Sequence, residues 1–160
     1  MIGPFEGPVL KKTGHARLLY LPHDNPKSLW SEWPEKLNLL DDYLKNQPRL
    51  STATDKIYLY FFGPDKSTAW FGREIIGHPT RLPEGLASFD SFASEVFEWR
   101  LPRHEGFKLT GGEVLGVEKQ LRSLAQEALA PTWRVEISGV EPWMRSVDNY
   151  DVAFQFYKLV

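Results

Sequence analysis

Two glutamates in the segment FASEVFEW, residues 92–99, stand where a carboxylate could meet a ligand. Side chains alternate between the faces of a β-strand, so Glu98 shares one face with small and apolar residues. Glu95 shares the other face with Phe97 and Trp99. We predict that this second face looks into a binding groove and that the first face packs beneath helices. Glu98 is then expected near water at the end of the strand.

A third carboxylate, Glu136, lies in TWRVEIS, residues 132–138, which alternates as a strand does. Trp133 begins the apolar face of this strand, and Arg134 shares the polar face with Glu136. Glu136 either faces solvent on a half-buried strand or lines a groove, and both interpretations stay open. Arg134 could pair with Glu136 across the pleat, which would reduce the pull of the carboxylate on a cation.

Aromatic residues make up 14% of the chain, and six of them are tryptophans. Such rings supply apolar area with a polar end and often line grooves or interfaces, although they also fill cores. Trp70 is a candidate for a groove wall, and Tyr60 is a candidate for a pocket wall or, preferably, the core. The complete set of candidate ligand-binding residues is Glu95, Phe97, Trp99, Glu136, Trp70, Tyr60 and Trp133.

Few residues indicate catalysis or a bound cofactor. The four histidines (His15, His23, His78 and His104) are scattered without metal-ligand spacing, and cysteine is absent. The sequence contains no nucleophile motif and no glycine-rich phosphate loop. We therefore expect no metal and no cofactor, and we assign no catalytic residue.

Length and charge bound the class of protein. The chain has 160 residues and a formal net charge of −2, with lysine and arginine spread along it, and it is expected to form one domain over residues 1–160. Nucleic-acid binding needs a basic stripe, and no helix-turn-helix fits before the first predicted strand. No apolar run suits a signal peptide or a membrane span. These features favour a cytoplasmic protein.

The predicted elements occur in the same order twice. In the first half, about residues 9–76, strands are expected at 15–23, 56–63 and 67–76. Between the first two, Ser31 can cap a helix and Pro34 suits its first turn. The helix then carries one apolar stripe, and Pro48 stops it; the stripe consists of Trp33, Leu37, Leu40 and Leu44.

The second half, about residues 86–160, follows a linker that contains two prolines. Strands are expected at 86–102, where a bulge can occur, at 132–138 and at 151–160. The sequence TGGE at 110–113 is a capping box that opens a helix, whose apolar stripe is predicted to reach Ala128 and which Ala130-Pro131 is expected to end. Both halves therefore predict β-α-β-β, and the fold class is α+β.

This order resembles the GyrI-like small-molecule-binding domain, the effector-binding module of bacterial transcription activators, whose fold is related to that of SOUL proteins. The stretches that carry the resemblance are FFGPDKSTAWFGREI, RLPEGLASFDSFASEVFEW, and LAPTWRVEI with YDVAFQFYKL. The resemblance covers nearly the whole chain. It implies duplicated units related by a pseudo-twofold axis, an antiparallel sheet with two helices on one side, and a ligand groove between the halves.

The resemblance also implies a ligand class, namely amphipathic and often cationic small molecules. Aromatic rings of the groove stack on such a ligand, and a buried glutamate pairs with its positive charge. This sequence differs from the family pattern at that point, because Arg134 stands where the family has its glutamate if Trp133 matches the preceding aromatic residue. The carboxylate here is Glu136, two residues later.

The leading hypothesis is a stand-alone, multidrug-type binding protein that sequesters or senses an amphipathic organic compound, cations among them. One alternative is a GyrI-like hydrolase of strained electrophiles, with Glu95 and Glu136 on neighbouring strands as its carboxylates. Another is a protein-interaction or regulatory domain that uses an exposed Trp143 and the acidic loop around Asp148 and Asp151. A protein partner or a homodimer is compatible with each of these hypotheses.

Overall fold

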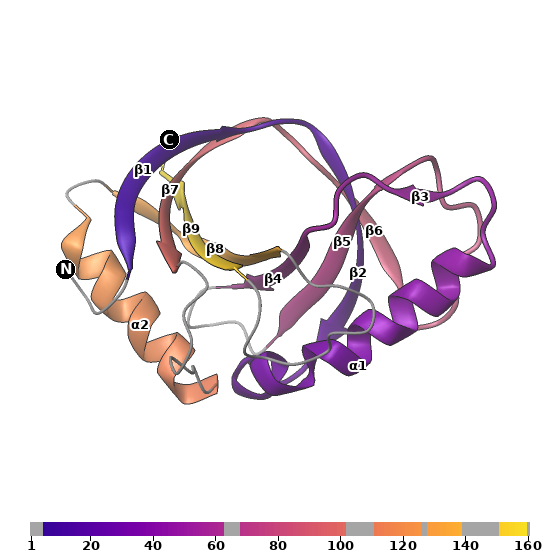
Figure 1. Cartoon of the computed structure of the whole chain (residues 1–160), viewed down its shortest axis with the longest axis horizontal. Coiled ribbons are helices and arrows are strands. Elements are labelled where there is room, and N and C mark those ends of the chain that lie inside the picture. Colours follow the sequence, from indigo (N-terminus) through magenta and orange to yellow (C-terminus); the bar gives the residue numbers. More distant parts are fainter. Residues whose placement is uncertain (1–4, 63–67, 102–110, 126–127, 139–150, 160) are drawn as a thin grey trace.

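The structure, a computed structural model, describes residues 5–62, 68–101, 111–125, 128–138 and 151–159. Nine strands and two helices occur in these residues (Figure 1). In chain order they are β1 (Glu6–Thr13), β2 (Ala16–His23), α1 (Pro26–Lys45), β3 (Ser51–Thr52), β4 (Ile57–Phe61), β5 (Ala69–Ile76), β6 (Ala87–Ser91), β7 (Ser94–Leu101), α2 (Gly111–Leu124), β8 (Leu129–Ser138) and β9 (Asp151–Lys158).

All the strands belong to one antiparallel sheet with the order β1-β7-β9-β8-β4-β5-β2-β6, and β3 pairs with β5 outside this path. The expected α+β class is therefore confirmed. Pairing follows the same scheme in the two halves, since β5 lies between β4 and β2 just as β9 lies between β8 and β7. The halves meet where β4 pairs with β8. Whether this shared scheme reflects a duplication stays a prediction, as does the division into halves within one domain.

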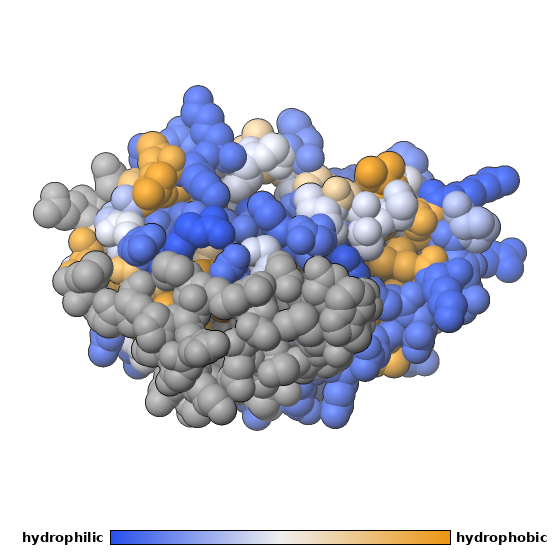
Figure 2. All heavy atoms as spheres, in the orientation of Figure 1, coloured by the Kyte–Doolittle hydropathy of each residue, from blue (hydrophilic) through white to orange (hydrophobic). Residues whose placement is uncertain are grey.

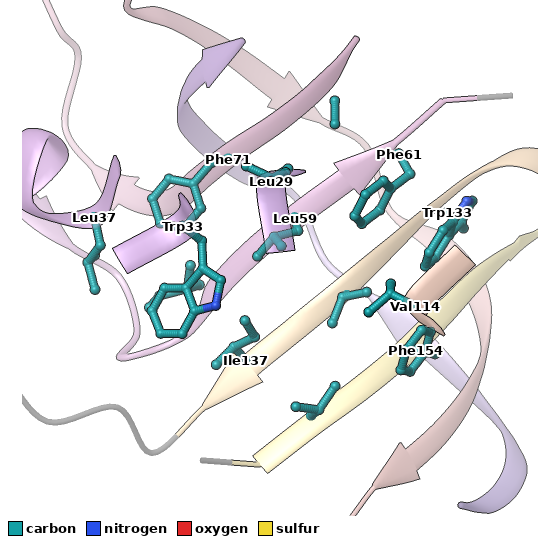
Figure 3. Close-up of a cluster of buried hydrophobic side chains, with 14 of the residues drawn as sticks. Leu29, Trp33, Leu37, Leu59, Phe61, Phe71, Val114, Trp133, Ile137 and Phe154 are labelled. Atoms are coloured by element: carbon teal, nitrogen blue, oxygen red, sulfur yellow. The ribbon is translucent and has the colours of Figure 1, made fainter. Parts of the chain in front are cut away.

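Both helices cover the same side of the sheet, and the main core lies between them and the strands (Figure 1). The stripe predicted for α1 is confirmed, because Trp33, Leu37 and Leu40 are at most 2% exposed and Leu44 packs at its edge. In Figure 3 the indole of Trp33 lies over the strands near Ile137. Val114 and Leu121 are the buried residues of α2 in this core.

β1 and β2 form one long arched segment, and β6 and β7 form another. The two segments pair with each other in a continuous register from Val9↔Glu98 through Thr13↔Ser94 to Tyr20↔Ala87. One end of this ribbon joins the main sheet through β9, and the other joins it through β5. The ribbon therefore arches over the sheet face that lies away from the helices, as the top of Figure 1 shows.

Several element boundaries differ from those predicted. α1 begins at Pro26 and not after Ser31, because Asn25 precedes it and its carbonyl oxygen accepts bonds from the amides of Ser28 and Leu29. The long strand predicted at 86–102 is interrupted at residues 92–93, where the ribbon bends.

The second helix and the N-terminal segment also differ. α2 ends at Leu124 and does not reach Ala128, and β8 already begins at Leu129. β8 therefore starts earlier than predicted and takes up Pro131 where its register shifts. Neither β1 nor the short β3 was predicted. β1 has few apolar residues because it is an edge strand, and all but two of its side chains are exposed.

Within the described part of the chain, no helix is long and apolar enough to cross a membrane.

Candidate functional site

A cavity of about 520 Å³ lies between the sheet and the arched ribbon. Its floor comes from the sheet face opposite the helices, and its cover comes from residues 11–16 and from residues of the segment 89–94. In the space-filling view, hydrophilic residues gather near the middle of the face of the molecule that Figure 2 shows. The floor residues that line the cavity are Tyr58, Glu74, Val96, Arg134, Glu136, Gln155 and Tyr157.

Gln155 is the centre of a buried hydrogen-bond network on this floor. Its Nε2 donates to Glu98 Oε2 at 2.7 Å and to Glu136 Oε2 at 3.2 Å. Its Oε1 accepts from Arg134 Nε at 2.5 Å. All four side chains are at most 5% exposed. One neutral amide thus links two carboxylates and one guanidinium, which satisfies groups that would otherwise be costly to bury.

Each of the two buried carboxylates also has basic or hydroxyl partners. Glu98 lies 3.2 Å from Lys11 Nζ and 3.5 Å from Arg100 Nη1. Glu136 accepts from the hydroxyl of Tyr58 at 3.2 Å and lies 3.5 Å from Lys56 Nζ. Lys11 and Lys56 are partly exposed and line the cavity, whereas Arg100 is partly exposed outside its lining.

Arg134 lies among three tyrosine rings. The carbon of its guanidinium is 4.4 Å from the ring centroid of Tyr58, 5.7 Å from that of Tyr60 and 5.8 Å from that of Tyr157. Its Nη1 also donates to Tyr60 Oη at 2.8 Å. Guanidinium groups stack well on aromatic faces, so these rings hold Arg134 in place. The expected pairing of Arg134 with Glu136 does not occur, because Arg134 turns toward Gln155 and the rings.

Burial affects the acidity of two of these tyrosines. It raises the pKa of Tyr58 well above the ordinary value of 10.0, and the nearby carboxylate of Glu136 raises it further. Burial likewise raises the pKa of Tyr157, against the opposing effect of the Arg134 cation. Both hydroxyls are therefore protonated at neutral pH and can donate hydrogen bonds.

The predicted assignment of faces on β7 is wrong. Trp99 is 2% exposed and belongs to the core beneath the helices, and Phe97 packs against that core. Glu98, expected near water, is the buried carboxylate on the cavity side. The reason is that the face with Phe97 and Trp99 continues to Leu101 and is the more apolar one, so it packs on the helices.

Glu95 does not line the central cavity. It pairs across the ladder with Lys12 and lines an adjoining hollow of about 550 Å³ near the end of β9. The hydrolase hypothesis placed Glu95 and Glu136 on neighbouring strands, and this placement is wrong, because β9 separates β7 from β8. The carboxylates that flank β9 on the cavity side are Glu98 and Glu136.

The remaining candidates divide between the two faces. Glu136, for which solvent and groove were both open, lies in the lining of the cavity. Tyr60 and Trp70 lie on the same face beside it, where Trp70 stacks on Tyr20 with ring centroids 4.0 Å apart. Trp133 is on the other face, 3% exposed, and stacks on Phe61 in the core (Figure 3). The ligand-binding roles of these side chains stay predictions.

Several residues of the cavity were not candidates. Gln155 could have been found from the sequence. It lies between Phe154 and Phe156 on a strand, so its amide lies on the face opposite those two rings and needs polar partners if it is buried. Lys11 was not found because β1 itself was not predicted. Of the residues that the protein-interaction hypothesis used, Trp143 and Asp148 lie outside the described residues, and Asp151 is the first residue of β9.

Comparisons with known proteins identify the fold. No family model matches the chain, and no curated protein matches it. Among solved structures, EcmrR in its complex with DNA aligns over 99% of this chain with a TM-score of 0.73 and 12% identity. This chain spans 59% of that EcmrR chain. The crystal structure of the EcmrR C-terminal domain aligns over 96% of this chain and 98% of its own, with a TM-score of 0.69 and 12% identity.

The chain has the GyrI-like fold. A third structure supports the assignment: SAV2435 bound to tetraphenylphosphonium aligns over 96% of this chain and 94% of its own. Its TM-score is 0.55, and its identity to this chain is 9%. At such identities the likeness concerns the fold and not the residues of the cavity, which are therefore interpreted from their own geometry.

Proposed function

We propose that this domain binds an amphipathic organic small molecule in the cavity beneath the arched ribbon, and that it carries out no chemistry on it. Such a protein senses or sequesters its ligand. The observation that carries the proposal is the cavity of about 520 Å³, whose floor combines tyrosine rings with a buried polar network. A few fixed polar groups beside aromatic walls are typical of small-molecule sites.

The neighbouring structures support the proposal by analogy. One of them is the C-terminal domain of EcmrR, and another holds tetraphenylphosphonium. The network on the cavity floor also supports the proposal, because its hydrogen bonds fix these side chains in position before a ligand binds. An ordered site loses less entropy on binding than a site that has to be assembled.

Binding is tested with a panel of cationic, neutral and anionic aromatic amphiphiles, by isothermal titration calorimetry and by thermal shift. At least one member is expected to raise the melting temperature and to bind with measurable heat. The variant Glu74→Trp tests the location, because Glu74 lines the cavity and a large ring there occupies its space. This variant should lose binding, whereas Glu35→Trp on the exposed side of α1 should keep it.

Absence of binding across the whole panel would refute the proposal. Equal binding by the wild-type protein and Glu74→Trp would place the ligand elsewhere and would refute the cavity as its site.

A further inference from the structure

The Arg134 side chain is a buried cation without a carboxylate partner. It is 5% exposed, and its guanidinium contacts the side-chain oxygens of Gln155 and Tyr60 together with aromatic rings. Among the described residues, no carboxylate oxygen lies within 4.0 Å of its guanidinium, and Nη2 makes no hydrogen bond. Burial of a cation is unfavourable unless an anion compensates it, so this guanidinium is a ready partner for one.

The same guanidinium occupies the aromatic surface that an organic cation would use. Tyr58, Tyr60 and Tyr157 all lie within 6 Å of it. A cationic ligand on these rings would have to displace Arg134 or lie beside it. In the second case like charges would meet in a partly desolvated space, where repulsion is strong.

The lining has a small excess of positive charge. Four cationic side chains and two carboxylates line the cavity, namely Lys11, Lys12, Lys56 and Arg134 against Glu74 and Glu136. The buried Glu98 pairs with Lys11, so that one net positive charge is left. Of the two carboxylates, Glu136 is already matched by Lys56 and by the hydroxyl of Tyr58. A cavity with this balance attracts anions from solution and repels cations.

We propose that the ligand is an aromatic or amphipathic anion whose negative group lies against Arg134. This inference rests on the proposed binding function and specifies its ligand class. Arg134 is then the residue that determines ligand charge: it lines the cavity with Nη2 not engaged in a hydrogen bond, and its Nε side is fixed by Gln155. A planar guanidinium held in this way suits a carboxylate, sulfonate or similar group.

Glu74 limits this preference and supplies a control. Its carboxylate lines the cavity without a side-chain hydrogen bond or ion pair among the described residues. An anion in the cavity therefore meets one uncompensated negative charge as well as Arg134. Removal of the Glu74 charge should strengthen anion binding, whereas removal of the Arg134 charge should weaken it.

The test compares tetraphenylborate with tetraphenylphosphonium, two probes of nearly equal size and shape but opposite charge. Calorimetric titration of the wild-type protein in sodium buffers is expected to show at least tenfold tighter binding of the borate. Arg134→Gln should abolish that preference, and Arg134→Lys should keep part of it because the charge remains. Glu74→Gln should bind the borate more tightly than the wild-type protein does.

The control Arg81→Gln removes an exposed arginine outside the cavity and should leave both affinities unchanged. Circular dichroism establishes that each variant is folded. Tighter binding of the phosphonium by the wild-type protein would overturn the anion inference and leave the proposed binding function intact. An equal loss of borate affinity in Arg81→Gln would attribute the preference to general surface charge and would also overturn it. Failure of both probes and of the wider panel would instead count against the binding function itself.

Discussion

Replacement of Gln155 by leucine removes the centre of the network on the cavity floor. Leucine has a similar volume, but it cannot donate to Glu98 and Glu136 or accept from Arg134. Three hydrogen bonds to charged groups are lost, each worth about 1.5 kcal/mol at the lower end of the usual range. The lower end applies because Gln155 borders the cavity, where water can replace part of the loss. The three bonds together give an expected loss in the free energy of unfolding of roughly 4 to 5 kcal/mol.

The assay is urea unfolding at neutral pH, followed by tryptophan fluorescence, together with the melting temperature. For a chain of this length a loss of about 4 kcal/mol lowers the melting temperature by about 10 °C. The matched control is Gln120→Leu, the same substitution on an exposed position of α2, which should change the free energy of unfolding by less than about 0.5 kcal/mol. If Gln155→Leu is as stable as Gln120→Leu, the network does not hold the floor together and the reasoning is wrong.

Two further predictions concern the same sheet face. A Cβ added at Gly72 would lie 2.7 Å from the carbonyl oxygen of Leu19, so Gly72→Ala should lower the free energy of unfolding by about 2 kcal/mol. The control Gly116→Ala adds its Cβ in open space on α2 and should not lower the free energy of unfolding. Chemical unfolding of both variants checks this, and equal stability would refute the steric argument. Because burial raises the pKa of Tyr58 and of Tyr157 in the folded state, their contribution to stability is complete below pH 10 and is lost as the pH rises above that value. Absorbance titration of phenolate should show these two ionising only with unfolding, and ionisation of all six tyrosines near pH 10 in the folded protein would contradict the prediction.

The sequence predicts those elements of the fold whose patterns are strongly periodic. The stripe of α1 is such a pattern, and so is the alternation in β8 that places Trp133 opposite Glu136. Faces are harder to assign where both carry apolar and acidic residues, as in β7. There the decision depends on Leu101, which continues the apolar face of Phe97 and Trp99, and on Phe92, which lies 76% exposed at the bend of the ribbon and belongs to neither face.

The candidate site is less predictable than the fold because its parts come together only through pairing between distant strands. Glu136 could be proposed from its own strand, and the replacement of the family glutamate by Arg134 is visible in the sequence. That Arg134 turns away from Glu136 follows from Gln155, which β9 inserts beside it in the ladder. No local pattern indicates this register, because it depends on how β8 and β9 align with each other across the segment that connects them.

The continuous ribbon has a consequence for how the cavity comes into being. Its hydrogen bond between the hydroxyl of Thr13 and the carbonyl of Ser94 joins residues 81 positions apart. The floor draws on both halves as well, because Tyr58 comes from one and Glu136 from the other. Neither half therefore contains the cavity, and it exists only when the entire chain has folded. A ligand held there stabilises the native state as a whole, so its concentration shifts the balance between complete folding and unfolding of every element at once.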